Sequence, residues 1–207
     1  MVITIKDIST IEIIEKKSRF IATAIPINSE DEAKTHLVNI KKTHYNANHN
    51  CYAYQLEDGI QKCSDDKEPS GTAGRPILDV LSGNNITNAI IIVTRYFGGT
   101  LLGTGGLVHA YSSAAKQVIL EATLIEQISV QLFSIKCNYA TLGKLEYLLQ
   151  SFNIRDKIYT DIVEIIVEVV LSEADNFSNW LVDNTNNKVE ILKKDIDIIF
   201  QDVSAKN

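Results

Sequence analysis

Apolar positions in the first part of the chain form short runs that predict strands, followed by one helical pattern. β-Branched and apolar residues dominate residues 11–14 and 19–27, which predicts two strands. Asn28 or Ser29 can cap a helix whose first turn is acidic, a charge that favours a helix N-terminus. The apolar positions of that helix recur at helical spacing, at Ala33, Leu37 and Ile40.

The middle of the chain alternates apolar segments with polar or glycine-rich ones. Residues 89–96 are apolar at nearly every position, which is typical of a central strand that is buried on both faces. Residues 61–74 and 98–106 are predicted loops. The other apolar segments predict a strand, a short helix and a longer helix, at residues 51–56, 76–81 and 107–122.

Beyond residue 124 the pattern predicts strands and helices in the order β-α-β-β-α-β. This order is typical of a ferredoxin-like domain. The sequence therefore predicts an α+β protein with two domains, residues 1–122 and residues 123–207. The strands of the second domain are predicted at residues 129–137, 154–160, 162–171 and 188–192, and its helices at residues 141–152 and 174–184.

Composition and charge narrow the class of protein. The chain carries 20 Lys and Arg against 26 Asp and Glu, a net charge of −6, whereas a general nucleic-acid-binding domain is usually strongly basic. No apolar run approaches the ~20 residues that cross a bilayer, and the first residues do not form a secretory signal. Three scattered cysteines fit free thiols in a reducing compartment. We therefore expect a cytoplasmic protein that binds neither membranes nor double-stranded DNA.

The first candidate site is the polar segment 65–76, in which three carboxylates lie within four residues. These carboxylates could supply the oxygen ligands of a divalent cation. Alternatively, the segment is a rigid loop that recognises a partner, or a solvated acidic loop that caps the next helix. Its candidate binding residues are Asp65, Asp66, Glu68, Ser70, Gly71 and Thr72.

The second candidate site is the segment 94–107, which follows the buried strand and opens a helix. Free backbone N–H groups at a helix N-terminus bind anions, and glycines let a phosphate approach the backbone. The segment lacks the Gly-Lys-Ser/Thr of a Walker A motif, and tight packing of strand against helix would demand the same small residues. Its candidate residues are Arg95, Tyr96, Gly98, Gly99, Gly103, Thr104, Gly105, Gly106 and His109.

Metal and nucleophile chemistry has one further candidate, His44 and His49 with Cys51. Their spacing matches no common zinc pattern, and it equally fits packing along one strand face. Cys51 with a histidine base would be a nucleophile without other support in the sequence. We therefore assign no catalytic residue, no metal ligand and no cofactor.

Four segments carry a resemblance to a known family. Residues 65–76 and 93–111 are similar to the signature segments of the IMPACT/YigZ family, and residues 18–22 and 44–54 resemble its upstream segments. The resemblance implies an N-terminal domain like the second domain of ribosomal protein S-five. It implies a ferredoxin-like second domain akin to one in elongation factor G. Eukaryotic relatives are translation regulators, which implies a translation-related protein or RNA as the partner.

Three positions depart from the family pattern. The family usually has glycine at the position of Lys67, lysine at that of Leu101 and arginine at that of His109. Two cations expected in the glycine segment are therefore absent or titratable. A small anion bound there would depend on backbone N–H groups, Arg95 and His109, and should bind more weakly than in typical members.

These observations favour a binding and regulatory protein linked to translation through protein contacts or local RNA contacts. The alternative is a protein that binds phosphate or nucleotide at the glycine segment, or a metal-assisted enzyme acting there. A third hypothesis is an adaptor that uses the edge of the C-terminal sheet.

Overall fold

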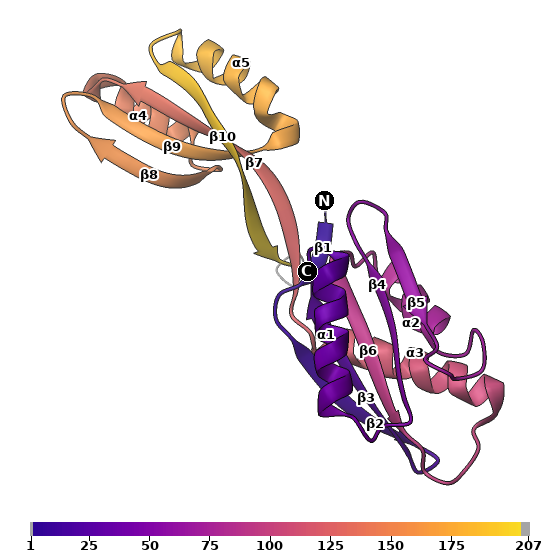
Figure 1. Ribbon diagram of the computed structural model, residues 1–207. Coiled ribbons are helices and arrows are strands. Elements are labelled where there is room, and N and C mark those ends of the chain that lie inside the picture. Colours follow the sequence, from indigo (N-terminus) through magenta and orange to yellow (C-terminus); the bar gives the residue numbers. More distant parts are fainter. Residues whose placement is uncertain (1, 204–207) are drawn as a thin grey trace. The chain divides into compact units, whose positions relative to one another are not determined.

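The computed structural model describes residues 2–203, which separate into two compact units. The first contains residues 2–126 together with 201–203, and the second contains residues 127–200. Both units combine a β-sheet with α-helices, so the predicted α+β class is confirmed (Figure 1).

The first unit is built on a five-stranded antiparallel sheet in the order β2-β3-β6-β4-β5. The central strand β6 carries no charged side chain before Arg95, and it is buried from Ala89 to that residue as its apolar run predicts. Its side chains alternate between the two faces, as successive strand residues must. The strands are β2 (Ser9–Glu15), β3 (Ser18–Pro26), β4 (His49–Gln55), β5 (Gln61–Ser64) and β6 (Ala89–Tyr96).

Helices cover both faces of this sheet (Figure 1). On one face, α2 (Gly74–Gly83) and α3 (Gly103–Glu121) pack on a core that includes Ile91 and Val93. On the other face, α1 (Glu30–Thr43) covers Ile90 and Ile92. The α1 helix begins as predicted, because Ser29 Oγ accepts a hydrogen bond from the Glu32 N–H at 3.2 Å.

The second unit has the predicted order β-α-β-β-α-β, and its strands are ordered β8-β9-β7-β10 across the sheet. The first strand in sequence thus lies beside the third and the fourth, which is the ferredoxin-like arrangement. Phe133, Leu145 and Phe177 belong to its buried core. The elements are β7 (Leu124–Cys137), α4 (Tyr139–Leu148), β8 (Asn153–Tyr159), β9 (Val163–Val170), the 3-10 turn η1 (Leu171–Glu173), α5 (Ala174–Thr185) and β10 (Glu190–Asp202).

The structure corrects several predicted boundaries. It adds the four-residue strands β1 (Val2–Ile5) and β5, which the pattern did not predict. It starts α3 at Gly103 rather than residue 107, because glycines in a first turn hide a helical pattern. It also extends β10 to Asp202, through ten further residues of which five are charged and most are exposed. None of the helices within residues 2–203 is long and apolar enough to cross a membrane.

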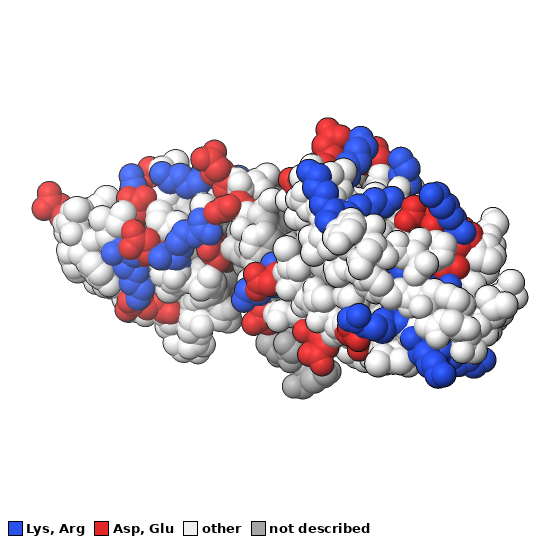
Figure 2. All heavy atoms as spheres, turned by 60° about the horizontal axis from the view of Figure 1, so that its bottom comes forward, with Lys and Arg blue, Asp and Glu red and all other residues white. Residues whose placement is uncertain are grey.

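Charged side chains of both signs are interspersed on the face shown in Figure 2. On the larger unit, at the right of that view, much of the surface between the charges is uncharged. Several cations of the larger unit pair with acidic neighbours, such as Arg19 with Glu12 at 2.8 Å.

Candidate functional site

Asp65 holds the loop between β5 and α2 in place. Its carboxylate accepts hydrogen bonds from the N–H groups of Gly71, Ala73 and Gly74 at 2.8–3.0 Å. Burial opposes ionisation of this carboxyl, but the three backbone donors outweigh it and lower its pKa. Of the hypotheses for this acidic segment, the capping of the next helix therefore fits Asp65, which binds N–H groups at the start of α2.

Replacing Asp65 with asparagine should lower the free energy of unfolding by about 1–2 kcal/mol at neutral pH, because a charged acceptor is lost. The lowered pKa contributes stability above the unfolded carboxyl pKa, and that stability is lost as pH falls through the folded pKa. The difference in free energy of unfolding between the wild type and Asp65→Asn, measured by urea titration, should therefore shrink below about pH 4. Asp79→Asn, which breaks an exposed pair with Arg75, serves as the control, and an equal loss there would contradict the expectation.

The three carboxylates of this loop point to different partners, which corrects the metal-site hypothesis. Asp65 caps α2, whereas Asp66 accepts from the Asn50 N–H at 2.7 Å and lies 3.2 Å from Lys41 Nζ. Glu68 turns to the protein interior. Within residues 2–203 no group of three or more His, Cys, Asp or Glu side chains could hold a metal ion.

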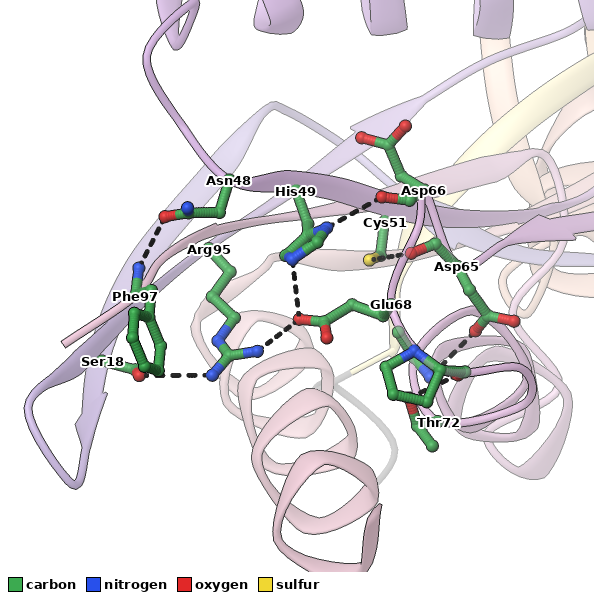
Figure 3. A network of polar contacts seen from close by, with 12 residues as sticks. Ser18, Asn48, His49, Cys51, Asp65, Asp66, Glu68, Thr72, Arg95 and Phe97 are labelled. Atoms are coloured by element: carbon green, nitrogen blue, oxygen red, sulfur yellow. Dashed lines mark hydrogen bonds and ion pairs between the residues drawn. The ribbon is translucent and has the colours of Figure 1, made fainter. Parts of the chain in front are cut away.

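Glu68 and Arg95 form a buried ion pair at the floor of the site. Glu68 Oε1 lies 2.6 Å from Arg95 Nη1 and accepts a hydrogen bond from Tyr111 at 2.8 Å. Arg95 Nη2 donates to Ser18 Oγ at 3.4 Å, and His49 Nε2 lies 3.7 Å from the same Glu68 oxygen. Figure 3 shows the carboxylate between the guanidinium and the imidazole. The sequence assigned both groups to external ligands, whereas here they neutralise each other.

The strand register explains why these groups meet. Arg95 on β6 lies opposite Phe20 on β3 and opposite His49 on β4. Paired residues of neighbouring strands share one face of a sheet. The guanidinium carbon also lies 5.4 Å from the ring centre of Phe20 and 5.6 Å from that of Phe97, distances typical of cation–π contacts.

A pocket of about 470 Å³ opens above this pair. Its rim is apolar, and Leu101 and Phe97 are 83% and 45% exposed there. The start of α3 forms one wall, through Gly103 and Thr104. The lining residues are Asn48, His49, Glu68, Pro69, Arg95, Phe97, Leu101, Leu102, Gly103, Thr104 and Leu107.

The other predicted site residues lie outside this lining. Tyr96 OH lies 2.9 Å from His44 Nδ1, and the Thr72 hydroxyl donates to the Pro69 carbonyl at 2.7 Å. The structure thus brings together four of the fifteen predicted residues, Glu68, Arg95, Gly103 and Thr104. The remaining nine, which neither line the pocket nor form those two contacts, are Asp65, Asp66, Ser70, Gly71, Gly98, Gly99, Gly105, Gly106 and His109.

Two of the departures from the family pattern acquire a structural meaning. Lys67 adopts a φ of 74°, the left-handed region in which glycine is free of strain, which explains the glycine of typical members. Leu101 forms part of the exposed rim, where a lysine would add a charge. His109 is exposed on α3, away from the pocket.

Cys51 and the two histidines do not form a zinc or nucleophile site. The Cys51 thiol donates to the Asp65 carbonyl at 3.0 Å, and His49 Nδ1 lies 2.9 Å from the Asp66 carbonyl oxygen. Burial raises the pKa of the Cys51 thiol to about 12, so the reactive thiolate is scarce at neutral pH. Cys137 is also buried and free.

Sequence reasoning missed most of the apolar lining of the pocket. Phe97 is an aromatic residue directly before two glycines, and this was the available signal of an exposed ring. Asn48 holds the backbone at this position, because its Oδ1 accepts a hydrogen bond from the Phe97 N–H at 2.8 Å. Pro69, Leu102 and Leu107 gave no comparable signal, since isolated apolar residues usually belong to a core.

The fold defines an α+β protein with two domains, and the pocket beside Arg95 lies in the first of them. Comparison with known proteins likewise finds two domains. Residues 16–119 match the Impact N-terminal domain, and residues 135–188 match a domain of unknown function, DUF1949. The chain belongs to the IMPACT family.

Several relatives match most of the chain. IMPACT family member YvyE of Bacillus subtilis is 38% identical over 91% of this chain and 88% of its own. IMPACT family member YigZ of Escherichia coli is 33% identical over 86% and 90%. A solved structure titled as that of a hypothetical protein aligns with a TM-score of 0.61 at 30% identity, covering 94% of this chain and 97% of that one.

Proposed function

We propose that this protein is a binding and regulatory protein whose pocket beside Arg95 receives an apolar side chain of a translation-related protein. One observation carries the proposal: a pocket of about 470 Å³ combines a polar floor that is neutralised internally with an exposed apolar rim. Exposed apolar residues around a hollow are typical of protein interaction sites.

The charges favour a protein over RNA as the partner. The cation at the floor, Arg95, pairs with Glu68, and Lys41 in the last turn of α1 pairs with Asp66. The chain as a whole carries a net charge of −6. RNA contacts draw on unpaired cations and on aromatic platforms for stacking, whereas an apolar side chain gains from the rim of Phe97 and Leu101.

Family membership supports the link with translation, because the resemblance implies a role of eukaryotic relatives in translation regulation. Relatives named Protein IMPACT occur in mouse and human, and they align with 54% of this chain. These alignments span 118 residues, a length similar to that of the N-terminal domain, which contains the pocket.

Binding to purified ribosomal subunits and translation factors tests the proposal. Leu101→Asp should weaken the interaction at least about tenfold, since a buried charge in an apolar contact costs more than 1.4 kcal/mol. Leu120→Asp is a matched control, because Leu120 is also 83% exposed but does not line the pocket. Equal effects of both variants would contradict the proposal, and binding to extracted ribosomal RNA that weakens with salt would favour RNA.

A specific observation supports a second candidate, the binding of a small anion such as phosphate or nucleotide. The N-terminus of α3 lines the pocket through Gly103 and Thr104, and the buried Arg95 Nε has no hydrogen-bond partner among the described residues. Thermal stabilisation by phosphate or nucleotides that is lost in a pocket variant would favour this candidate.

A further inference from the structure

The second unit contains its own pocket, which the proposed function does not use. It has a volume of about 440 Å³ and lies where β9 passes through η1 into α5. Three of its lining residues are aromatic and one is a carboxylate. The lining residues are Phe152, Val169, Glu173, Asn176, Phe177 and Trp180.

The aromatic rings form one cluster. The ring centres of Phe152 and Phe177 lie 4.9 Å apart, and Trp180 lies 5.8 Å from the first and 6.0 Å from the second. Phe177 is buried in the core, whereas Trp180 is 36% exposed. The cluster is therefore anchored on one side and open to a ligand on the other. Aromatic ring faces attract cations, and tryptophan does so most strongly.

Glu173 gives this pocket a negative charge that the protein does not neutralise. Nearby carboxylates have cationic partners, since Glu168 pairs with Arg155 at 2.6 Å and Asp175 with Lys193 at 2.7 Å. Glu173 has no ion pair or side-chain hydrogen bond within residues 2–203, and its carboxylate accepts no capping hydrogen bond at the start of α5. The lining contains no Lys or Arg, and residues 127–200 carry 7 basic against 11 acidic side chains.

We propose that this pocket binds an arginine side chain of a protein partner. A guanidinium is planar and weakly hydrated, so it stacks on an aromatic face while its N–H groups donate to a carboxylate. A lysine ammonium would gain from Glu173 but would lose more hydration and would not stack. Nucleic acid is disfavoured, because its phosphates would meet an unpaired carboxylate. The site lies in the other domain, so it stands independently of the proposed function.

Trp180 provides the readout, because it is the only tryptophan in the chain. Its fluorescence should change saturably when the full chain is titrated with N-acetyl-arginine amide. The neutral isostere N-acetyl-citrulline amide should produce no saturable change, and N-acetyl-lysine amide should bind more weakly. An equal response to the arginine and citrulline probes, or tighter binding of the lysine probe, would overturn the proposal.

A pair of charge variants locates the site. Glu173→Gln should weaken the arginine probe about fivefold, as expected for a partly exposed ion pair worth about 1 kcal/mol. Asp183→Asn removes a charge from α5, outside the pocket, and should leave the affinity within twofold. Equal losses of affinity in both variants would show that only the overall charge of the protein matters, and would overturn the assignment of the site. Circular dichroism establishes that each variant is folded. If a variant does not fold, the comparison of the arginine, citrulline and lysine probes on the wild-type protein still tests the proposal.

Discussion

Replacing Arg95 with methionine is expected to lower the free energy of unfolding by about 3–5 kcal/mol, because it leaves the Glu68 carboxylate buried without its cation. The side chains of Arg95 and Glu68 are only 7% and 3% exposed. Tyr111 would remain as a donor to Glu68, and burial raises the pKa of its phenol, which keeps it protonated. A single remaining donor offsets only part of the lost interaction. Urea unfolding at pH 7 measures the loss.

The control for this expectation is another arginine on the same sheet. Arg19 on β3 pairs with Glu12 at 2.8 Å, but these side chains are 51% and 38% exposed. Arg19→Met should therefore cost less than about 1 kcal/mol. If Arg95→Met lowered the free energy of unfolding no more than Arg19→Met does, the buried pair of Arg95 and Glu68 would not stabilise the fold as its burial indicates.

Replacing Gly98 with alanine is expected to cost about 3 kcal/mol of stability, because the added Cβ meets backbone atoms that cannot rotate away. An ideal Cβ at Gly98 would lie 2.0 Å from the carbonyl carbon of Lys17 and 2.4 Å from the Ser18 nitrogen. The Gly98 N–H also donates to Ser18 Oγ at 3.2 Å. The close approach of the loop after β6 to the β2–β3 turn depends on this glycine. Thermal and urea unfolding of the variant measure the cost.

Gly105→Ala gives the matched comparison within the same glycine-rich segment. A Cβ at Gly105 would have no atom within 4 Å outside its own helix, and the residue lies in the first turn of α3. Alanine favours helices, so the substitution should be neutral or stabilising by up to about 1 kcal/mol. Similar losses in both variants would show that general glycine content, rather than the contact at Gly98, matters here.

Much of the fold could be predicted from local pattern alone. The apolar run of residues 89–96 predicted the central strand, because a strand that is buried on both faces has apolar residues at nearly every position. The strand β5 (Gln61–Ser64) was missed because it lies at the sheet edge with mostly exposed residues, so it has no apolar alternation. Short strands of four residues, such as β1, carry too few positions for a period to show.

The site was less predictable, because its central contact joins residues from different elements. Glu68 and Arg95 are 27 positions apart, and each was interpreted as a ligand for something external. The pairing follows from the β3-β6-β4 register and from the loop before α2, neither of which local spacing specifies. The apolar rim was likewise hidden, since the exposure of Leu101 depends on the whole loop.

A photoactivatable amino acid placed at position 101, and in a second variant at position 120, tests the central claim most directly. Both leucines are equally exposed, but only position 101 lines the pocket. The proposed function predicts cross-links from position 101 to one translation-related protein in a mixture of purified ribosomal subunits and factors, with none from position 120. Cross-links of equal yield from both positions, or from position 120 alone, would contradict it.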